Sequence, residues 1–129
     1  ALPGVRLLVP ATWCSNHPGT VDFESLGMPY VDALWSCDAL ICKPGYGSFV
    51  EAAIAGVPVL HLERPDWPEA PYLVRWLEGN SRCSLLTQER WLEGDFLDSL
   101  NRLWREELPR PIAPTGVEEA VETLVKLLI

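Results

Sequence analysis

A single stretch, residues 39–60, places the strongest constraint on how this chain folds. It opens with Ala-Leu-Ile-Cys, which is typical of a buried strand, and a turn containing Gly45 and Gly47 follows. The pattern then predicts a helix over residues 48–55 and a second strand over residues 59–62. Two strands joined through a helix make a parallel βαβ unit. The turn before such a helix points backbone N–H groups at its occupant, so we expect an anion there, a phosphate above all.

Strands and helices alternate along the rest of the chain. Further strands are predicted at residues 6–9, 21–23 and 83–86, and further helices at residues 30–36, 72–77, 87–91, 96–108 and 116–128. Apolar strands that alternate with helices are typical of α/β proteins. We therefore predict a Rossmann-like layered α/β fold with a mainly parallel sheet flanked by helices, in one domain spanning residues 1–129.

Charge and composition exclude several classes of function. The formal net charge is −8, whereas a protein that binds nucleic acid by neutralising phosphates is normally basic. The same charge argues against anionic membrane surfaces, but a local nest of N–H groups still suits one small anion. The longest apolar run is far shorter than the roughly 20 residues of a transmembrane helix, and no signal peptide is recognisable. We expect a cytoplasmic protein without a transmembrane segment.

The cysteines and histidines show no spacing typical of a metal site. Residues 14, 37, 42 and 83 are cysteines that lack a CxxC pair, and residues 17 and 61 are the histidines. We expect buried, reduced thiols, with no disulfide framework, no metal and no cofactor. No combination of Ser, His and Asp or of Cys and His indicates a nucleophilic catalytic site.

The glycine turn by itself is a weak signal. No Gly-Lys-Ser/Thr follows it, and Val50 stands where G-x-G-x-x-G requires a third glycine. Residues 38–58, DALICKPGYGSFVEAAIAGVP, nevertheless resemble the donor-binding signature of GT-B glycosyltransferases, the family that includes the GlcNAc transferase of peptidoglycan lipid II synthesis. The positions that match in register are Lys43, Gly45, Ser48, Glu51, Gly56 and Pro58. Residues 30–95 are also similar to the glycosyltransferase-like N-terminal region of plant arabinokinases.

The resemblance implies a role for each residue of the turn. Gly45, Tyr46 and Gly47 would face the donor diphosphate, and Ser48 would contact a phosphate through its hydroxyl and backbone N–H. Glu51 would accept hydrogen bonds from the ribose 2′- and 3′-hydroxyls, because a carboxylate has two oxygens for a vicinal diol.

Other interpretations of the same residues stay open. The spacing Ser48-x-x-Glu51 is also a capping box, in which Glu51 only satisfies the backbone at the helix start. Lys43 lies near the phosphates or is a solvated surface cation. In the loop after residue 62, Arg64 pairs with the diphosphate or with Asp66.

The same loop differs from the family at the position that contacts the donor sugar. Many members carry a Gln there, and this chain has Pro-Glu-Ala-Pro-Tyr over residues 68–72. Glu69 is the group left to bond sugar hydroxyls, so the donor sugar stays open. Trp67 stacks on a sugar or covers the loop.

The resemblance implies the C-terminal, donor-binding half of a GT-B glycosyltransferase that binds a nucleotide-diphosphate sugar, UDP-sugar being the expected class. We expect a fragment that lacks the first strand of the domain and the N-terminal acceptor domain, with the catalytic base outside it and no turnover alone. Two alternatives remain: a non-catalytic sugar-nucleotide-binding or regulatory module, and a sugar-nucleotide epimerase or hydrolase on the same fold.

Overall fold

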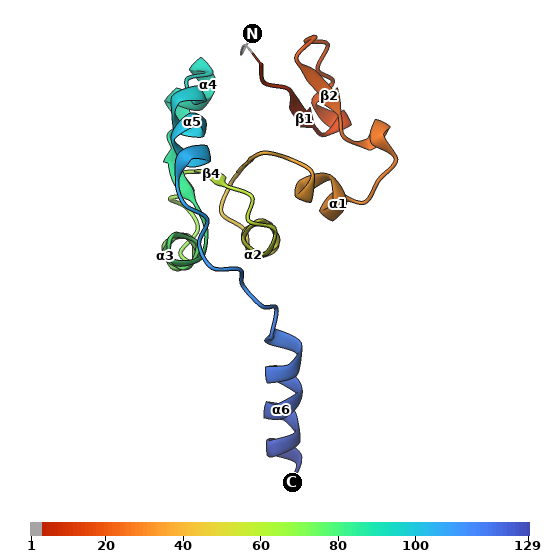
Figure 1. Cartoon of the computed structure of the whole chain (residues 1–129), viewed down its shortest axis with the longest axis vertical. Coiled ribbons are helices and arrows are strands. Elements are labelled where there is room, and N and C mark those ends of the chain that lie inside the picture. The colour runs from red at the N-terminus through yellow and green to blue at the C-terminus, as the bar shows by residue number, and fades with distance from the viewer. Residues whose placement is uncertain (1–3) are drawn as a thin grey trace.

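The protein is a mixed α/β structure with short parallel sheets flanked by helices, described here over residues 4–129 of a computed structural model (Figure 1). The strands are β1 (Leu7–Val9), β2 (Thr20–Asp22), β3 (Leu40–Cys42), β4 (Val59–Leu62) and β5 (Cys83–Leu86). The helices are α1 (Tyr30–Trp35), α2 (Tyr46–Ala55), α3 (Ala70–Asn80), α4 (Gln88–Glu93), α5 (Leu97–Arg105) and α6 (Gly116–Leu128), with 3-10 turns η1 (Ala11–Trp13) and η2 (Glu24–Leu26). The predicted α/β class with parallel strands is confirmed.

The strands form two sheets where one was predicted. Strands β3, β4 and β5 lie in that order and pair in parallel, whereas β1 and β2 form a separate parallel pair. Figure 1 shows the β1–β2 pair set apart from the larger sheet. The three-stranded sheet contains the βαβ unit that residues 39–60 predicted.

Helices cover both faces of the three-stranded sheet because apolar side chains alternate along its strands. One face packs against α2, α3 and Leu34 of α1 through a cluster whose buried members are Leu34, Phe49, Ala52, Val57, Val59, Leu73 and Leu77. The other face packs against α4 and α5 through a cluster with Leu60, Leu86, Phe96, Leu100 and Leu103. Consecutive residues of β4, Val59 and Leu60, point to opposite faces and are both fully buried.

Helix α2 begins two residues earlier than predicted. Gly45 is its N-cap, with an extended backbone, and Tyr46 is its first residue. Gly56 ends it with a φ of 70°, and a Cβ there would meet the Leu108 side chain at 3.0 Å; the helix thus ends at residue 55, as predicted. The helix is apolar on most sides but not buried on all of them, since Val50 is 40% exposed.

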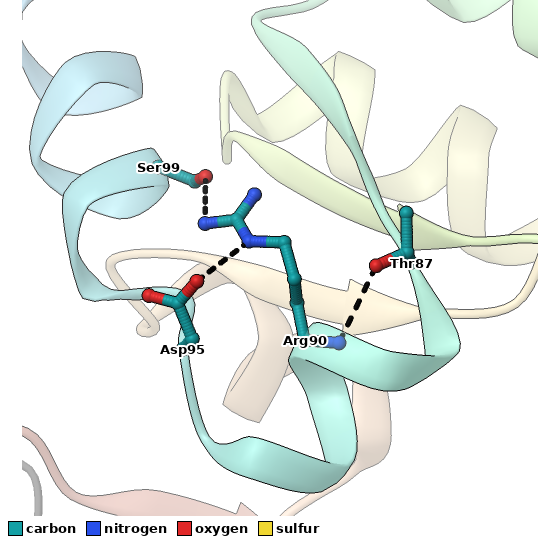
Figure 2. Close-up of polar contacts among 4 residues, drawn as sticks. All are labelled: Thr87, Arg90, Asp95 and Ser99. Atoms are coloured by element: carbon teal, nitrogen blue, oxygen red, sulfur yellow. Dashed lines mark hydrogen bonds and ion pairs between the residues drawn. The ribbon is translucent and has the colours of Figure 1, made fainter.

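The corner between α4 and α5 is held by Arg90 (Figure 2). Its Nε atom lies 2.9 Å from the Asp95 carboxylate, and its Nη2 donates to the hydroxyl of the buried Ser99 at 3.3 Å. The Thr87 hydroxyl accepts from the Arg90 backbone N–H at 3.3 Å and so caps the start of α4. These contacts fix the direction in which α5 returns across the sheet.

Arg82 links the start of β5 to the ends of α2 and α5. It precedes β5, and its guanidinium donates to the carbonyl of Gly56 at 2.8 Å and to the carbonyl of Leu103 at 3.3 Å. Gly56 is the C-cap of α2 and Leu103 lies in the last turn of α5. The cation lies at the C-termini of two helices, where it complements the negative end of each helix dipole, and the Leu103 carbonyl also accepts from the Glu106 backbone N–H at 3.3 Å.

Helix α6 stands away from the rest of the protein. It follows the proline-rich stretch over residues 109–114 and projects beyond the sheets (Figure 1). None of its residues is buried, and Val121 and Leu124 are among its exposed apolar side chains. No helix within residues 4–129 combines the length and the apolar composition needed to cross a membrane.

Candidate functional site

The glycine turn lies at the carboxyl edge of the larger sheet, as the βαβ pattern predicted. Residues 43–45 follow β3 and residues 63–69 follow β4, and because the strands are parallel, both loops leave the same edge. Open α/β sheets bind ligands in the crevice outside this edge. Eight residues were predicted to bind the donor. Seven of them lie in these two loops or in the first turn of α2, and the eighth, Glu51, lies one turn further along α2.

The start of α2 offers free backbone donors. The N–H of Phe49 is the first that bonds within the helix, to the Gly45 carbonyl at 3.1 Å. The N–H groups of Tyr46, Gly47 and Ser48 precede it and have no intrahelical acceptor. Gly45 has no side chain with which to cap them, and no side-chain cap is present. The positive end of the helix dipole therefore faces the turn without a protein acceptor.

The turn is buried at Pro44 and open at Gly47. Pro44 is fully buried, which anchors the backbone between β3 and α2. A Cβ built on Gly47 would have no heavy atom within 4 Å, so nothing in the protein requires a glycine at that place. Lys43 is exposed beside it. Glycine with free space around it is what close approach of a ligand to the backbone needs.

Ser48 is the third residue of α2 and not its N-cap, so the capping-box interpretation of Ser48-x-x-Glu51 is wrong. The helix starts earlier because Gly45 adopts the extended conformation of an N-cap. Within residues 4–129, no hydrogen bond engages the Glu51 carboxylate. Glu51 is half-buried and remains chemically available on the face of α2 that it shares with Ser48.

The loop after β4 folds back onto the turn. Arg64 donates from Nη1 to the Pro44 carbonyl at 3.2 Å, and its guanidinium carbon lies 4.2 Å from the centre of the Trp67 ring. Tyr46 approaches Trp67 edge-on, with ring centroids 5.9 Å apart. The Tyr46 hydroxyl donates to Glu69 Oε2 at 2.5 Å, and this bond raises the pKa of Tyr46.

These contacts bear on two of the alternatives for the loop. Arg64 forms no ion pair with Asp66; it stacks on Trp67 and bonds the turn backbone. Trp67 packs against the buried cluster below α2, which is the covering role that the sequence left open. The structure thus brings Tyr46, Arg64 and Glu69 together around one aromatic ring.

Tyr30 is a site residue that the sequence did not indicate. It is the first residue of α1, and its ring lies beside Ser48 and Glu51. Burial raises the pKa of the Tyr30 phenol, the neighbouring Ser48 hydroxyl lowers it, and the negative charge of Glu51 adds to the rise. No spacing rule links Tyr30 to α2, because the two meet only through tertiary packing.

His61 is buried, whereas the cysteines differ in exposure: Cys14 is exposed, contrary to the expectation of buried thiols, and the other three are partly buried. His61 is 5% exposed, packs edge-on against Phe49, and its Nδ1 has no hydrogen-bond partner. Burial lowers its pKa, so the neutral ring is favoured. All four cysteines are free thiols, and no group of three His, Cys, Asp or Glu side chains within residues 4–129 is arranged to hold a metal ion.

A separate cavity lies away from this turn. It has a volume of about 610 Å³ and lies between β1 and β3, and none of the eight predicted donor-site residues lines it. Tyr30 borders both the cavity and the candidate site. In comparisons with known proteins, no family model, no curated protein and no solved structure matches this chain.

Proposed function

We propose that this chain is the donor-binding domain of a glycosyltransferase of the GT-B type, and that the start of α2 binds the diphosphate of a nucleotide sugar. The observation that carries the proposal is the set of three consecutive N–H groups, on Tyr46, Gly47 and Ser48, that have no acceptor within the helix and no capping side chain. The open space beside Gly47 lets phosphate oxygens reach them. Lys43, in the same turn, adds a positive charge.

The ribose and the sugar have separate candidate partners. Glu51 lies one turn beyond Gly47 on α2, with no protein hydrogen bond on its carboxylate, and would accept both hydroxyls of a ribose. Tyr30 would flank that ribose, since it lies beside Glu51. On the other side of the turn, Tyr46 and Glu69 form a hydrogen-bonded pair whose oxygens suit sugar hydroxyls.

The chemical contribution of such a site is to stabilise the leaving group. When the bond from the sugar to the diphosphate breaks, negative charge grows on the departing nucleotide. Fixed N–H dipoles stabilise that charge without having to reorient during the reaction. The proposal concerns the donor site alone; it assigns no catalytic base to these residues, and we expect binding without sugar transfer from residues 1–129.

The test is a titration of the chain with UDP, UDP-GlcNAc, GDP and inorganic pyrophosphate, followed by NMR shifts of the backbone amides. We expect UDP and pyrophosphate to shift the amides of Tyr46, Gly47 and Ser48. The variant Glu51→Gln should weaken UDP and leave pyrophosphate unchanged, because Glu51 would contact only the ribose. Glu118→Gln on the distant α6 is the matched control.

The outcomes separate the components of the proposal. If no nucleotide and no pyrophosphate shifts these amides at millimolar concentration, the donor-site assignment fails. If Glu51→Gln weakens UDP and pyrophosphate equally, Glu51 stabilises the turn and does not bind ribose. If Glu51→Gln binds UDP as tightly as the unaltered chain does, Glu51 does not contact the ribose, and the diphosphate site at the start of α2 is unaffected by that result.

A further inference from the structure

Two strand edges face the same cavity. In the register of β1 with β2, Leu7 and Val9 bond the neighbouring strand, so the N–H and C=O of Leu8 point the other way. In the register of β3 with β4, Leu40 bonds across, so the backbone of Ile41 points away from β4. Within residues 4–129, β1 pairs only with β2, and β3 pairs only with its neighbour β4. Both free edges line the 610 Å³ cavity, which we call the slot.

Helices form the other two walls of the slot. Ala33 and Leu34 of α1 line it on the side of the α2–α3 layer. Trp91 of α4 and Leu100 and Trp104 of α5 line it on the opposite side. The slot therefore spans the thickness of the sheet layer, with a strand edge on each side and an apolar helix layer above and below. One more strand, with apolar side chains on both faces, has this environment.

The connections along the chain place the two sheets in one continuous order. Helix α1, which connects β2 to β3, packs on the same face of the sheet as α2 and α3. Right-handed crossover connections that advance in the same direction along a sheet lie on the same face of it. The connection from β1 to β2 lies on the opposite face, where Trp13 of η1 meets Trp91 at 6.4 Å between ring centroids. The winding direction thus reverses at the slot.

A reversal of winding is the switch point of a doubly wound sheet. The order β2, β1, slot, β3, β4, β5 matches the doubly wound order 3-2-1-4-5-6 with its strand 1 in the slot. We propose that the slot binds an extended apolar β-strand from a polypeptide segment outside residues 1–129, which pairs with β1 and β3 and joins the two sheets into one. The proposal does not depend on nucleotide binding.

The test uses a short synthetic probe peptide with a run of Val and Ile between terminal lysines, added to the intact chain. We expect saturable binding and amide hydrogen exchange at least about tenfold slower at Leu8 and Ile41, because those N–H groups gain acceptors. The same peptide with a central proline should not bind, since it loses a donor to one edge and the extended pairing.

A matched pair of protein variants localises the binding. Leu8→Pro removes an N–H that points into the slot, and Leu85→Pro removes an N–H from the outer edge of β5. Both leucines are about equally exposed, at 38% and 45%. We expect Leu8→Pro to abolish peptide binding and Leu85→Pro to retain it, and circular dichroism of each variant shows whether it is folded.

Three results would overturn the proposal. One is the absence of binding up to the solubility limit of the probe. Another is equal protection of the Leu85 amide, which would mean that the peptide adheres to any strand edge. The third is a dimer in sedimentation experiments whose Leu8 and Ile41 amides are already protected, since a second copy would then fill the slot. If Leu8→Pro fails to fold, the proline-containing peptide on the unaltered chain still decides the matter.

Discussion

Replacing Gly47 by Ala separates the folding role of the glycine turn from its binding role. Gly47 is the second residue of α2, its φ is not positive, and a Cβ there meets nothing within 4 Å. Glycine within a helix costs roughly 0.5–1 kcal/mol relative to alanine, because the unfolded chain loses more freedom on folding. Gly47→Ala should therefore raise the free energy of unfolding by about 0.5–1 kcal/mol.

Urea unfolding followed by circular dichroism measures this change, and a thermal scan should show a rise in Tm of about 2–6 °C for a chain of this size. Gly79→Ala is the matched control, because Gly79 lies in α3 and also has nothing within 4 Å of its Cβ position. Both variants should be stabilised, and only one should change ligand binding.

The added methyl group at residue 47 would occupy the space through which a diphosphate reaches the helix start. We expect Gly47→Ala to weaken UDP and pyrophosphate at least about tenfold, which is about 1.4 kcal/mol. Gly79→Ala should bind them as the unaltered chain does. Destabilisation by Gly47→Ala would refute the inference that the surrounding space is free. A stabilised Gly47→Ala with unchanged affinity would show that no ligand approaches this glycine.

Three further predictions concern His61, the cysteines and Arg82. Burial lowers the pKa of His61, so as pH falls below about 6.5 the unfolded chain binds a proton before the folded protein does. The free energy of unfolding should therefore decline until the pH is below the lowered pKa of the folded state. In His61→Leu this decline should be absent from the urea midpoint measured against pH. Burial raises the pKa of Cys42 to about 12 and that of Cys83 to about 11, whereas Cys14 is exposed. Iodoacetamide at pH about 8 should therefore modify Cys14 well before the other two, which mass spectrometry measures. Rapid labelling of Cys42 in the folded protein would contradict its burial. Arg82→Met should lower the free energy of unfolding by about 2–4 kcal/mol, because two helix C-terminal carbonyls lose a charged donor, and a loss below about 0.5 kcal/mol would mean that water replaces it.

Local signals account for the elements that the sequence predicted well. The larger sheet was predictable because its strands are continuous apolar runs, and β4 and β5 have the predicted bounds. The end of α2 was predictable because Gly56 needs its positive φ. The start of α2 was predicted too late, since a glycine N-cap leaves no side-chain signal and Gly47 is a poor helix former.

Features that depend on tertiary contact were beyond the sequence. The division into two sheets reflects which strand edges meet, and no local pattern carries that information. Tyr30 reaches Ser48 only because α1 packs on the same face as α2. Trp104 is 38% exposed, and its Nε1 donates to the Asp38 carbonyl at 2.8 Å, a contact between distant segments that no local pattern indicates. The glycine turn of the candidate site was predictable from the sequence, whereas the stacking of Arg64 on Trp67 beside it was not.

The stacking of Arg64 on Trp67 has a kinetic consequence. The guanidinium, the indole and the Tyr46 ring already hold one another in the ligand-free protein. Their rotamer freedom is lost during folding, so a nucleotide would meet a preorganised surface and would not have to order these side chains itself. We therefore expect association in a single concentration-dependent step, without a slow rearrangement after the encounter.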